Sequence, residues 1–101
     1  MISLLKTLFG KGIDYKDLVS KGAVIVDVRS KEEFRGGHIK NSINIPLDQV
    51  KSYMPEFRKM KKPIITVCRS GARSGIACGL LKSGGIENYN GGAWDSLNKK
   101  I

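Results

Sequence analysis

Short apolar runs rich in β-branched residues alternate along the chain with segments whose apolar residues recur at helical spacing. Residues 23–26 and 63–67 are nearly continuous apolar runs, which are typical of strands buried on both faces. Residues 43–45 predict a brief strand that Pro46 ends, and residues 87–89 predict a last, weaker strand. The alternation of strand and helix predicts an α/β fold with a mostly parallel sheet and right-handed crossovers.

Five segments with helical spacing or helix-end signals alternate with these strands: residues 14–21, 30–36, 47–60, 74–83 and 93–99. Asp14 is placed to cap the first helix, and Ser30 with Glu33 fits a capping box for the second. Pro55 interrupts the third, so two short helical pieces are expected there. A turn at residues 91–92 should precede the last helix. The apolar face of the fourth is predicted to hold Ile76, Ala77, Leu80 and Leu81.

The first 12 residues predict a short amphipathic helix ahead of a single domain over residues 13–101. Its apolar residues at helical spacing are Ile2, Leu5, Leu8 and Phe9. Packing on the domain surface is favoured over membrane contact, because one short segment binds membranes poorly. Lys6 falls inside the apolar stretch, unlike in a secretory signal, and no apolar run approaches the roughly 20 residues that span a bilayer. We therefore expect a cytoplasmic protein without a membrane span.

Length and composition fit one globular domain with a marked excess of positive charge. The 101 residues are 41% hydrophobic and 27% charged, and 18 Lys and Arg against 9 Asp and Glu give a net charge of +9. Such a field attracts small oxyanions, acidic proteins, nucleic acid or anionic membranes. The cations are densest over residues 51–62, where Glu56 is the one acid. We expect a solvated helix face there, with docking of an acidic protein as the alternative.

The same composition disfavours several kinds of partner and site. With few aromatic residues and no interleaving of basic and aromatic side chains, nucleic acid binding is not expected. Two cysteines are too few for a disulfide framework, and no His and Cys cluster has zinc spacing. We therefore expect no zinc site, and no strong apolar seam argues against a monomer.

Cys68 follows a buried strand directly, and the loop after it leads into a helix. The residues of this candidate active-site loop are Cys68, Arg69, Ser70, Gly71, Ala72, Arg73 and Ser74. Converging loop N–H groups, the positive end of a helix and two arginines all favour an anion there. A thiol in this field should lose its proton easily and attack an anionic substrate. Packing alone accounts poorly for Cys68, whereas Cys78, inside the following helix, is interpreted as structural rather than as a resolving thiol.

At this point the chain resembles the rhodanese-like sulfurtransferases in their small single-domain form. The matching blocks are Asp-Val-Arg at 27–29 with Glu-Phe at 33–34, Gly-His-Ile at 37–39 with Ser-Ile-Asn-Ile-Pro at 42–46, the loop at 68–74, and Tyr-Asn-Gly-Gly at 89–92 with Trp94. The resemblance implies a five-stranded, mostly parallel sheet flanked by helices on both faces. It also implies that Cys68 takes the outer sulfur of thiosulfate or of a persulfide donor. The resulting persulfide passes its sulfur to a thiol or to cyanide, and this implied exchange needs neither a metal nor an organic cofactor.

The remaining matched residues have structural interpretations beside functional ones. Ligands bind beyond the carboxyl ends of parallel strands, so residues 27–29 should lie next to the Cys68 loop. Asp27 and Arg29 are expected to brace that loop by hydrogen bonds or an ion pair, with substrate contact as the alternative. His38 is expected to order a turn rather than to carry a proton. Trp94 is expected to pack, or to border the mouth of the pocket.

Two other functions stay open beside sulfur transfer by an enzyme. Four residues separate Cys68 from Arg73, one fewer than in the related phosphatases, so a phosphatase or arsenate reductase is disfavoured. The main alternative is a sulfur-relay or binding module with a dedicated partner, such as a thioredoxin or another sulfur-accepting protein. In either case Arg69 and Arg73 are expected to attract and orient an anionic donor such as thiosulfate.

Overall fold

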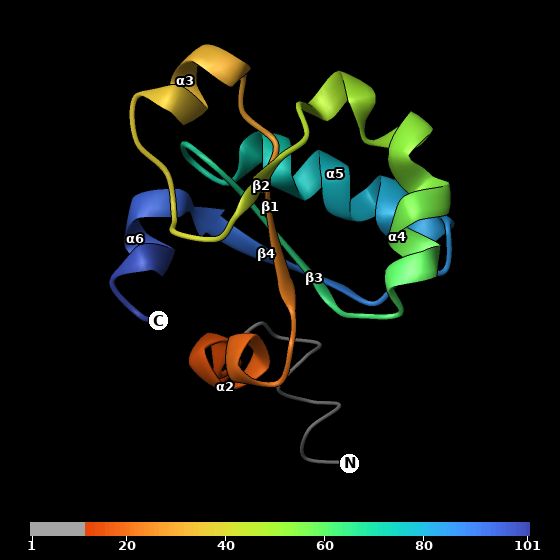
Figure 1. Ribbon diagram of the computed structural model, residues 1–101, viewed down its shortest axis with the longest axis horizontal. Coiled ribbons are helices and arrows are strands. Elements are labelled where there is room, and N and C mark those ends of the chain that lie inside the picture. Colours follow the sequence, from red (N-terminus) through yellow and green to blue (C-terminus); the bar gives the residue numbers. More distant parts are fainter. Residues whose placement is uncertain (1–11) are drawn as a thin grey trace.

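A computed structural model describes residues 12–101 of the chain. These residues form a four-stranded, all-parallel sheet with the strand order β2–β1–β3–β4 (Figure 1). The strands are β1 (Val24–Asp27), β2 (Ile43–Asn44), β3 (Ile64–Cys68) and β4 (Asn88–Ala93). The helices are α2 (Tyr15–Ser20), α3 (Lys31–Arg35), α4 (Met54–Met60), α5 (Ala72–Ser83) and α6 (Trp94–Asn98). The helix predicted over residues 1–12 falls, up to residue 11, outside the described part.

The described sheet has four strands, so the expectation of five is wrong. Residues 12–14 add no strand beside β4, because α2 begins at Tyr15 with Asp14 as its N-cap. The Tyr15 hydroxyl instead donates to the carbonyl of Asn90 in β4 at 3.0 Å. At the opposite edge β2 is only two residues long, and the chain leaves it through Pro46, which has no N–H to extend the ladder. The parallel sheet flanked by helices is confirmed.

Two layers of helices bury the sheet from both sides. Ile64 packs in one core cluster with Phe57 of α4 and Leu81 of α5. Its neighbour Ile65 belongs to a second cluster with Leu97 of α6, and α2 also packs there. Burial on both faces explains why the sequence of β3 is a continuous apolar run rather than an alternating one.

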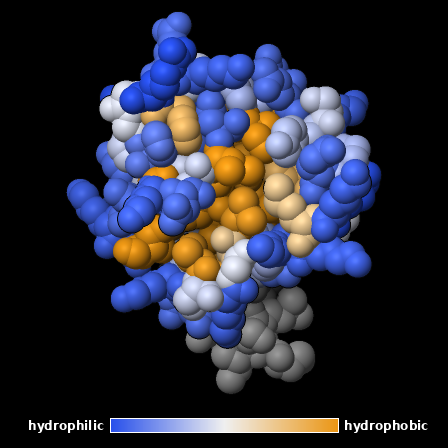
Figure 2. Space-filling view, viewed as in Figure 1, coloured by the Kyte–Doolittle hydropathy of each residue, from blue (hydrophilic) through white to orange (hydrophobic). Residues whose placement is uncertain are grey.

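The surface seen from the β2 edge of the sheet is mostly hydrophilic. An apolar band crosses its middle, over β1 and β2 (Figure 2). Among residues 12–101, no helix is long and apolar enough to cross a membrane.

Local signals place the starts of α2 and α3 as predicted. Asp14 accepts a backbone N–H of the first turn of α2 at 3.0 Å, and Ser30 and Glu33 form both bonds of a capping box. Residues 47–60 do form short helical pieces, but the interruption expected at Pro55 is not there. Pro55 lies in the first turn of α4, where an N–H has no helical partner in any case. Two short 3₁₀ turns, at Leu47–Gln49 and Lys51–Tyr53, precede it.

Helix α5 differs from its prediction at its start and in its buried face. It begins at Ala72, two residues early, because Gly71 at a φ of 102° turns the chain directly from the loop into the helix. Ile76 is not on the buried face, since 59% of its surface is exposed. Ser74 is buried instead, in line with Ala77. A polar residue thus occupies a core position, which apolar periodicity alone does not reveal.

Strand β4 continues through Gly91 and Gly92, where a turn was predicted. Thr66 of β3 pairs with Asn90, and the next residue of β3 pairs with Gly92. Gly91 is therefore the extra residue of a β-bulge. The bulge lets β4 stay beside β3 as far as Cys68, so β4 reaches the loop that carries the chemistry.

Candidate active site

Cys68 is the last residue of β3, and its sulfur sits in a cradle formed by the turn into α5. The residue is 1% exposed. Its Sγ accepts the backbone N–H of Gly71 at 2.9 Å and that of Ser74 at 3.4 Å. The left-handed conformation of Gly71, which side chains other than glycine rarely adopt, lets the two N–H groups converge. Converging N–H groups of this kind stabilise negative charge on the atom that they meet.

The cradle lowers the pKa of the Cys68 thiol. Burial by itself raises this pKa, because a thiolate loses its hydration. Hydrogen bonds from the Ser74 hydroxyl and from the N–H groups of Ser74, Gly71 and Ser70 outweigh burial and leave the pKa below its ordinary value. The thiolate, which is the nucleophilic form, is therefore the form that the loop stabilises.

The two arginines of the loop have different surroundings. Arg73 forms a two-pronged ion pair with Glu33 of α3, with N–O distances of 2.8 and 3.0 Å. The hydrogen bonds of this pair, together with those that Ser30 donates in the capping box, lower the pKa of Glu33 to about 2, and the pair raises the pKa of Arg73. Arg69 is exposed on the loop. Arg73 thus ties the loop to α3, and Arg69 is the arginine that faces solvent.

A buried ion pair ends β1 beside the loop. Arg29 holds both carboxylate oxygens of Asp27, with Nε–Oδ1 and Nη2–Oδ2 distances of 2.9 and 2.7 Å. The side chains of Arg29 and Asp27 are 4% and 0% exposed. Arg29 also donates to the Gly37 carbonyl at 2.7 Å, and its guanidinium lies 4.7 Å from the ring centroid of Trp94. Because Asp27 pairs with Val67, residues 27–29 adjoin the Cys68 loop, and Arg29 links them to the turn after α3 and to α6.

Comparison with known proteins identifies this arrangement. A model of the rhodanese-like domain matches residues 13–95. The chain belongs to the rhodanese-like family. A solved structure described as rhodanese with anions from E. coli superposes with a TM-score of 0.68 at 29% identity, over 73% of this chain and 89% of that one.

Curated relatives include sulfurtransferases. The rhodanese-like domain is 34% identical to a putative mitochondrial thiosulfate sulfurtransferase of Schizosaccharomyces pombe, over 80% of this chain and 67% of that protein. It is 45% identical to YqhL of Bacillus subtilis, but the match covers 67% of this chain and 54% of YqhL. An adenylyltransferase and sulfurtransferase, UBA4, of Scheffersomyces stipitis is 38% identical over 67% of this chain and 18% of that protein. The chain therefore spans about half of YqhL and a fifth of UBA4.

His38 of the rhodanese-like domain lies at the turn that follows α3. Its Nδ1 donates to the Phe34 carbonyl at 2.7 Å, and its ring stacks on the Phe34 ring with 3.7 Å between centroids. These two contacts hold His38 against Phe34 and order the turn, and that His38 carries no proton in the reaction stays a prediction.

Cys78 contrasts with Cys68 in the same rhodanese-like domain. Its Sγ lies 3.2 Å from the Thr66 hydroxyl. Burial raises the pKa of Cys78 more than this hydrogen bond lowers it. Cys78 is therefore favoured as a neutral thiol, which agrees with a structural interpretation.

Two residues at the site were not among those predicted for it. Asn90 accepts the Ser74 hydroxyl at 2.6 Å, across 16 residues of sequence. Glu33 was assigned to the capping box, and the same carboxylate reaches Arg73 across 40 residues. Neither long-range contact leaves a local signal in the sequence, because helix caps and strand ends are recognised only from near neighbours.

Proposed function

We propose that the protein is a sulfurtransferase that carries sulfane sulfur on Cys68. The cradle supports this most directly, since a buried sulfur accepts two backbone N–H groups and has a lowered pKa. The Cys68 thiolate attacks the outer sulfur of thiosulfate, and the S–S bond of the donor breaks with its electron pair leaving on sulfite. The loop N–H groups stabilise the resulting persulfide anion. A thiolate or cyanide then attacks the outer sulfur, and the Cys68 thiolate is the leaving group.

A small anionic donor suits the electrostatics of the chain. The net charge is +9, and Arg69 stands exposed on the loop. Thiosulfate is the donor proposed first, a persulfide the second, and the exchange needs no metal or organic cofactor. We place this chemistry in the cytoplasm, in a monomer, where reducing conditions keep a catalytic thiol available.

The dimensions of the cradle support sulfur transfer over phosphate chemistry. The N–H groups of Gly71 and Ser74 converge on the Cys68 sulfur itself, at 2.9 and 3.4 Å. Arg73 is held by Glu33 rather than extended around a substrate oxyanion. A phosphoryl group needs donors spread around its oxygens. We therefore expect no hydrolysis of an aryl phosphate.

Turnover with thiosulfate and cyanide tests the proposal, with formation of thiocyanate as the readout. Wild-type protein and Cys78→Ser should both form thiocyanate, and Cys68→Ser should form none while its circular dichroism and unfolding midpoint stay close to those of the wild type. Turnover by a folded Cys68→Ser variant would contradict the assignment of the carrier.

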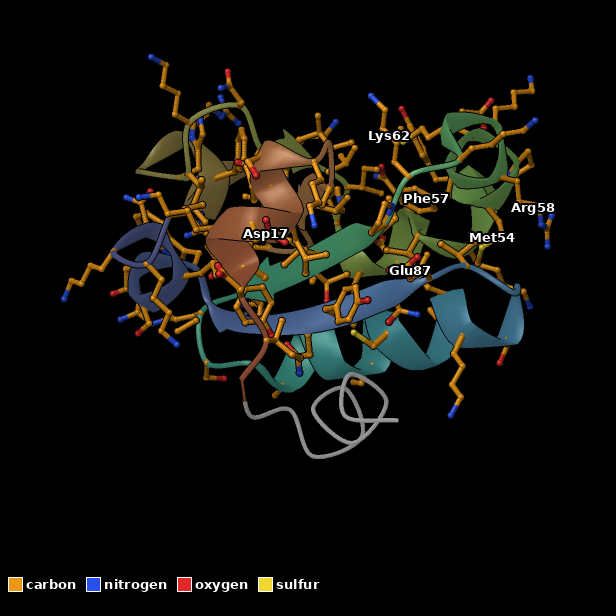
Figure 3. All side chains as sticks on the ribbon, turned by 90° about the horizontal axis from the view of Figure 1, so that it is seen from below. Asp17, Met54, Phe57, Arg58, Lys62 and Glu87 are labelled. Carbon is orange, nitrogen blue, oxygen red and sulfur yellow. The ribbon has the colours of Figure 1, made fainter. Side chains whose placement is uncertain are left out.

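Relay to a protein partner is the second candidate, and a basic surface supports it. Residues 51–62 border two hollows, of about 280 Å³ and 570 Å³, and Arg58 lines both. Lys61 and Lys62 line the smaller one with Phe57 at its wall, and its one acid is Glu87. Figure 3 shows Arg58 and Lys62 extending outward from this end of the molecule. We propose that an acidic sulfur-accepting protein docks here.

The position of this surface sets the size of such a partner. The smaller hollow lies at Pro63, just before β3, and Cys68 ends the same strand. Five residues of strand span about 16 Å, and the hollow and Cys68 lie at opposite ends of this buried strand, so a partner docked at the hollow has to extend around the sheet to reach Cys68. The double variant Arg58→Glu with Lys62→Glu should slow sulfur transfer to reduced thioredoxin and leave transfer to cyanide unchanged. Lys40→Glu, which reverses an exposed charge elsewhere, is the control. An equal loss of transfer rate to thioredoxin and to cyanide would contradict docking.

A further inference from the structure

Ser74 lies between two hydrogen-bond acceptors, and its hydroxyl can donate to only one of them. Its Oγ lies 2.6 Å from Asn90 Oδ1 and 3.5 Å from Cys68 Sγ, and the residue is 0% exposed. An amide oxygen can only accept, so the short contact takes the hydroxyl hydrogen. While Cys68 is protonated, the Ser74 oxygen accepts from its thiol. In that protonation state a chain of donors runs from the sulfur to the hydroxyl to the amide oxygen.

Hydrogen bonds at both ends of the Asn90 amide fix its orientation. Its Nδ2 donates to the Gly71 carbonyl at 3.2 Å, and its Oδ1 also accepts the Gly92 N–H at 2.9 Å. Exchanging the amide ends would place the NH₂ group against the Gly92 N–H and leave the Ser74 hydroxyl without this acceptor. The oxygen therefore faces Ser74. The bulge in β4 places Asn90 next to the loop.

We propose that Asn90 is a positioning residue that acts on Cys68 through Ser74. It competes with the sulfur for the Ser74 hydroxyl hydrogen, so the hydroxyl gives up its bond to Asn90 when it turns to donate to the thiolate. The inference rests on the proposed function, because the role that it gives Asn90 is to keep the Cys68 sulfur a strong nucleophile for sulfur transfer. The nucleophilicity of a thiolate falls as the pKa of its thiol falls, so a cradle with every donor engaged would give an abundant but sluggish thiolate.

The other charged groups around the sulfur stay in place when Asn90 is changed. Arg73 is coupled electrostatically to Cys68, and Glu33 of α3 and Asp27 of β1 act on Arg73. Arg29 in turn is paired with Asp27. None of these groups bonds to the Asn90 side chain, whose described partners are Ser74, Gly71 and Gly92. A change in the titration of Cys68 on substitution of Asn90 therefore reports on the hydroxyl or on the loop backbone.

The test is the rate of alkylation of Cys68 by iodoacetamide as a function of pH, in a Cys78→Ser background. In Asn90→Ala the Ser74 hydroxyl donates to the thiolate without first giving up a bond to Asn90. Alkylation should become roughly threefold faster at low pH, because more thiolate forms, and roughly threefold slower on the high-pH plateau, because that thiolate is less nucleophilic. The two profiles should cross. Asn90→Asp should shift the profile the opposite way, because a nearby carboxylate disfavours the thiolate.

Two controls separate positioning from general loosening of the loop. Asn88→Ala, in the same strand, removes a side chain that donates to the Ile86 carbonyl, and its profile should match the wild type. In a Ser74→Ala background, Asn90→Ala should have no effect on the profile. An effect that persists there would overturn the inference, since it would act through the Gly71 carbonyl instead.

An unchanged profile in Asn90→Ala, or a shift toward slower alkylation at low pH, would also overturn the inference. Because Asn90 is exposed, its substitution is expected to leave the fold intact, and circular dichroism checks this. Alkylation reports on the thiol whether or not sulfur is transferred. A negative alkylation result would therefore not contradict the proposed sulfur transfer. If no sulfur is transferred, the alkylation profiles still test the role of Asn90.

Discussion

Glu33 performs two tasks with one carboxylate at the entrance to the site. It closes the capping box of α3 and forms the ion pair with Arg73. Glutamine can also close a capping box, so Glu33→Gln removes the charge of the pair and keeps the cap. The substitution thus isolates what the ion pair contributes to stability.

The stability that this ion pair contributes should be lost in acid. The pKa of Glu33 is about 2 in the folded chain against 4.5 as its ordinary value, first because of Arg73 and then because of Ser30, so these contacts stabilise the fold fully above pH 4.5 and progressively less as the pH falls toward 2. Urea unfolding of wild type and Glu33→Gln should therefore differ near neutral pH and converge in that window. Glu32→Gln, an exposed change in the same helix, is the control. A difference independent of pH would contradict the role of the ion pair.

Arg29 should be far more costly to replace than a surface arginine. Arg29→Met leaves the Asp27 carboxylate buried without its partner, which costs about 3–5 kcal/mol in comparable cases. Arg35→Met makes the same change at an exposed position of α3 and should stay within about 0.5 kcal/mol of the wild type. Urea midpoints of the two variants provide the measurement. Equal midpoints would show that the Asp27 pair does not brace the fold.

At the residue scale, the sequence identified the reactive residue better than the residues that its loop contacts. Cys68 was recognised because packing alone rarely places a thiol between a buried strand and a loop with two arginines. The pairing of Arg73 with Glu33, and of Ser74 with Asn90, could not be predicted, because it depends on how α3 and β4 pack against the loop. Such contacts are properties of the tertiary structure.

At the scale of elements, two glycines should respond to alanine in opposite directions. A Cβ at Gly91 would lie 2.9 Å from the Ile65 side chain and 3.0 Å from the Thr66 carbonyl oxygen, so Gly91→Ala should destabilise by about 1–3 kcal/mol. A Cβ at Gly79, exposed within α5, meets nothing within 4 Å, so Gly79→Ala should stabilise by about 0.5–1 kcal/mol. Thermal unfolding of both variants provides the measurement. Equal tolerance at the two positions would contradict the close packing of the bulge.

The elements show which local signals can be trusted. β-branched runs and capping residues predicted the strands and the starts of α2 and α3, because these signals act within a few residues. Pro55 and the glycines of β4 were misread for a shared reason. Proline suits a helix start as well as a break, and glycine suits a bulge as well as a turn. Only the neighbours in space decide between the two.

At the scale of the molecule, the alternation of elements predicted the α/β architecture and the edge at which the site lies. Residues 27–29 and 68–74 come from strands that pair side by side, as parallel strands with ligands at their carboxyl ends require. The fifth strand came from the family resemblance. The apolar pattern itself indicated four strands, and the described chain has four. The apolar pattern therefore predicted the number of strands better than the family resemblance did.

The assignment of Cys68 as the sulfur carrier is open to a direct check, the intact mass of the reduced protein after treatment with thiosulfate. Wild-type protein and Cys78→Ser should each gain the mass of one sulfur atom, and cyanide should remove it. Cys68→Ser should gain nothing. A gain of sulfur that survives in Cys68→Ser, or no gain in the wild type with either thiosulfate or a persulfide donor, would contradict this assignment.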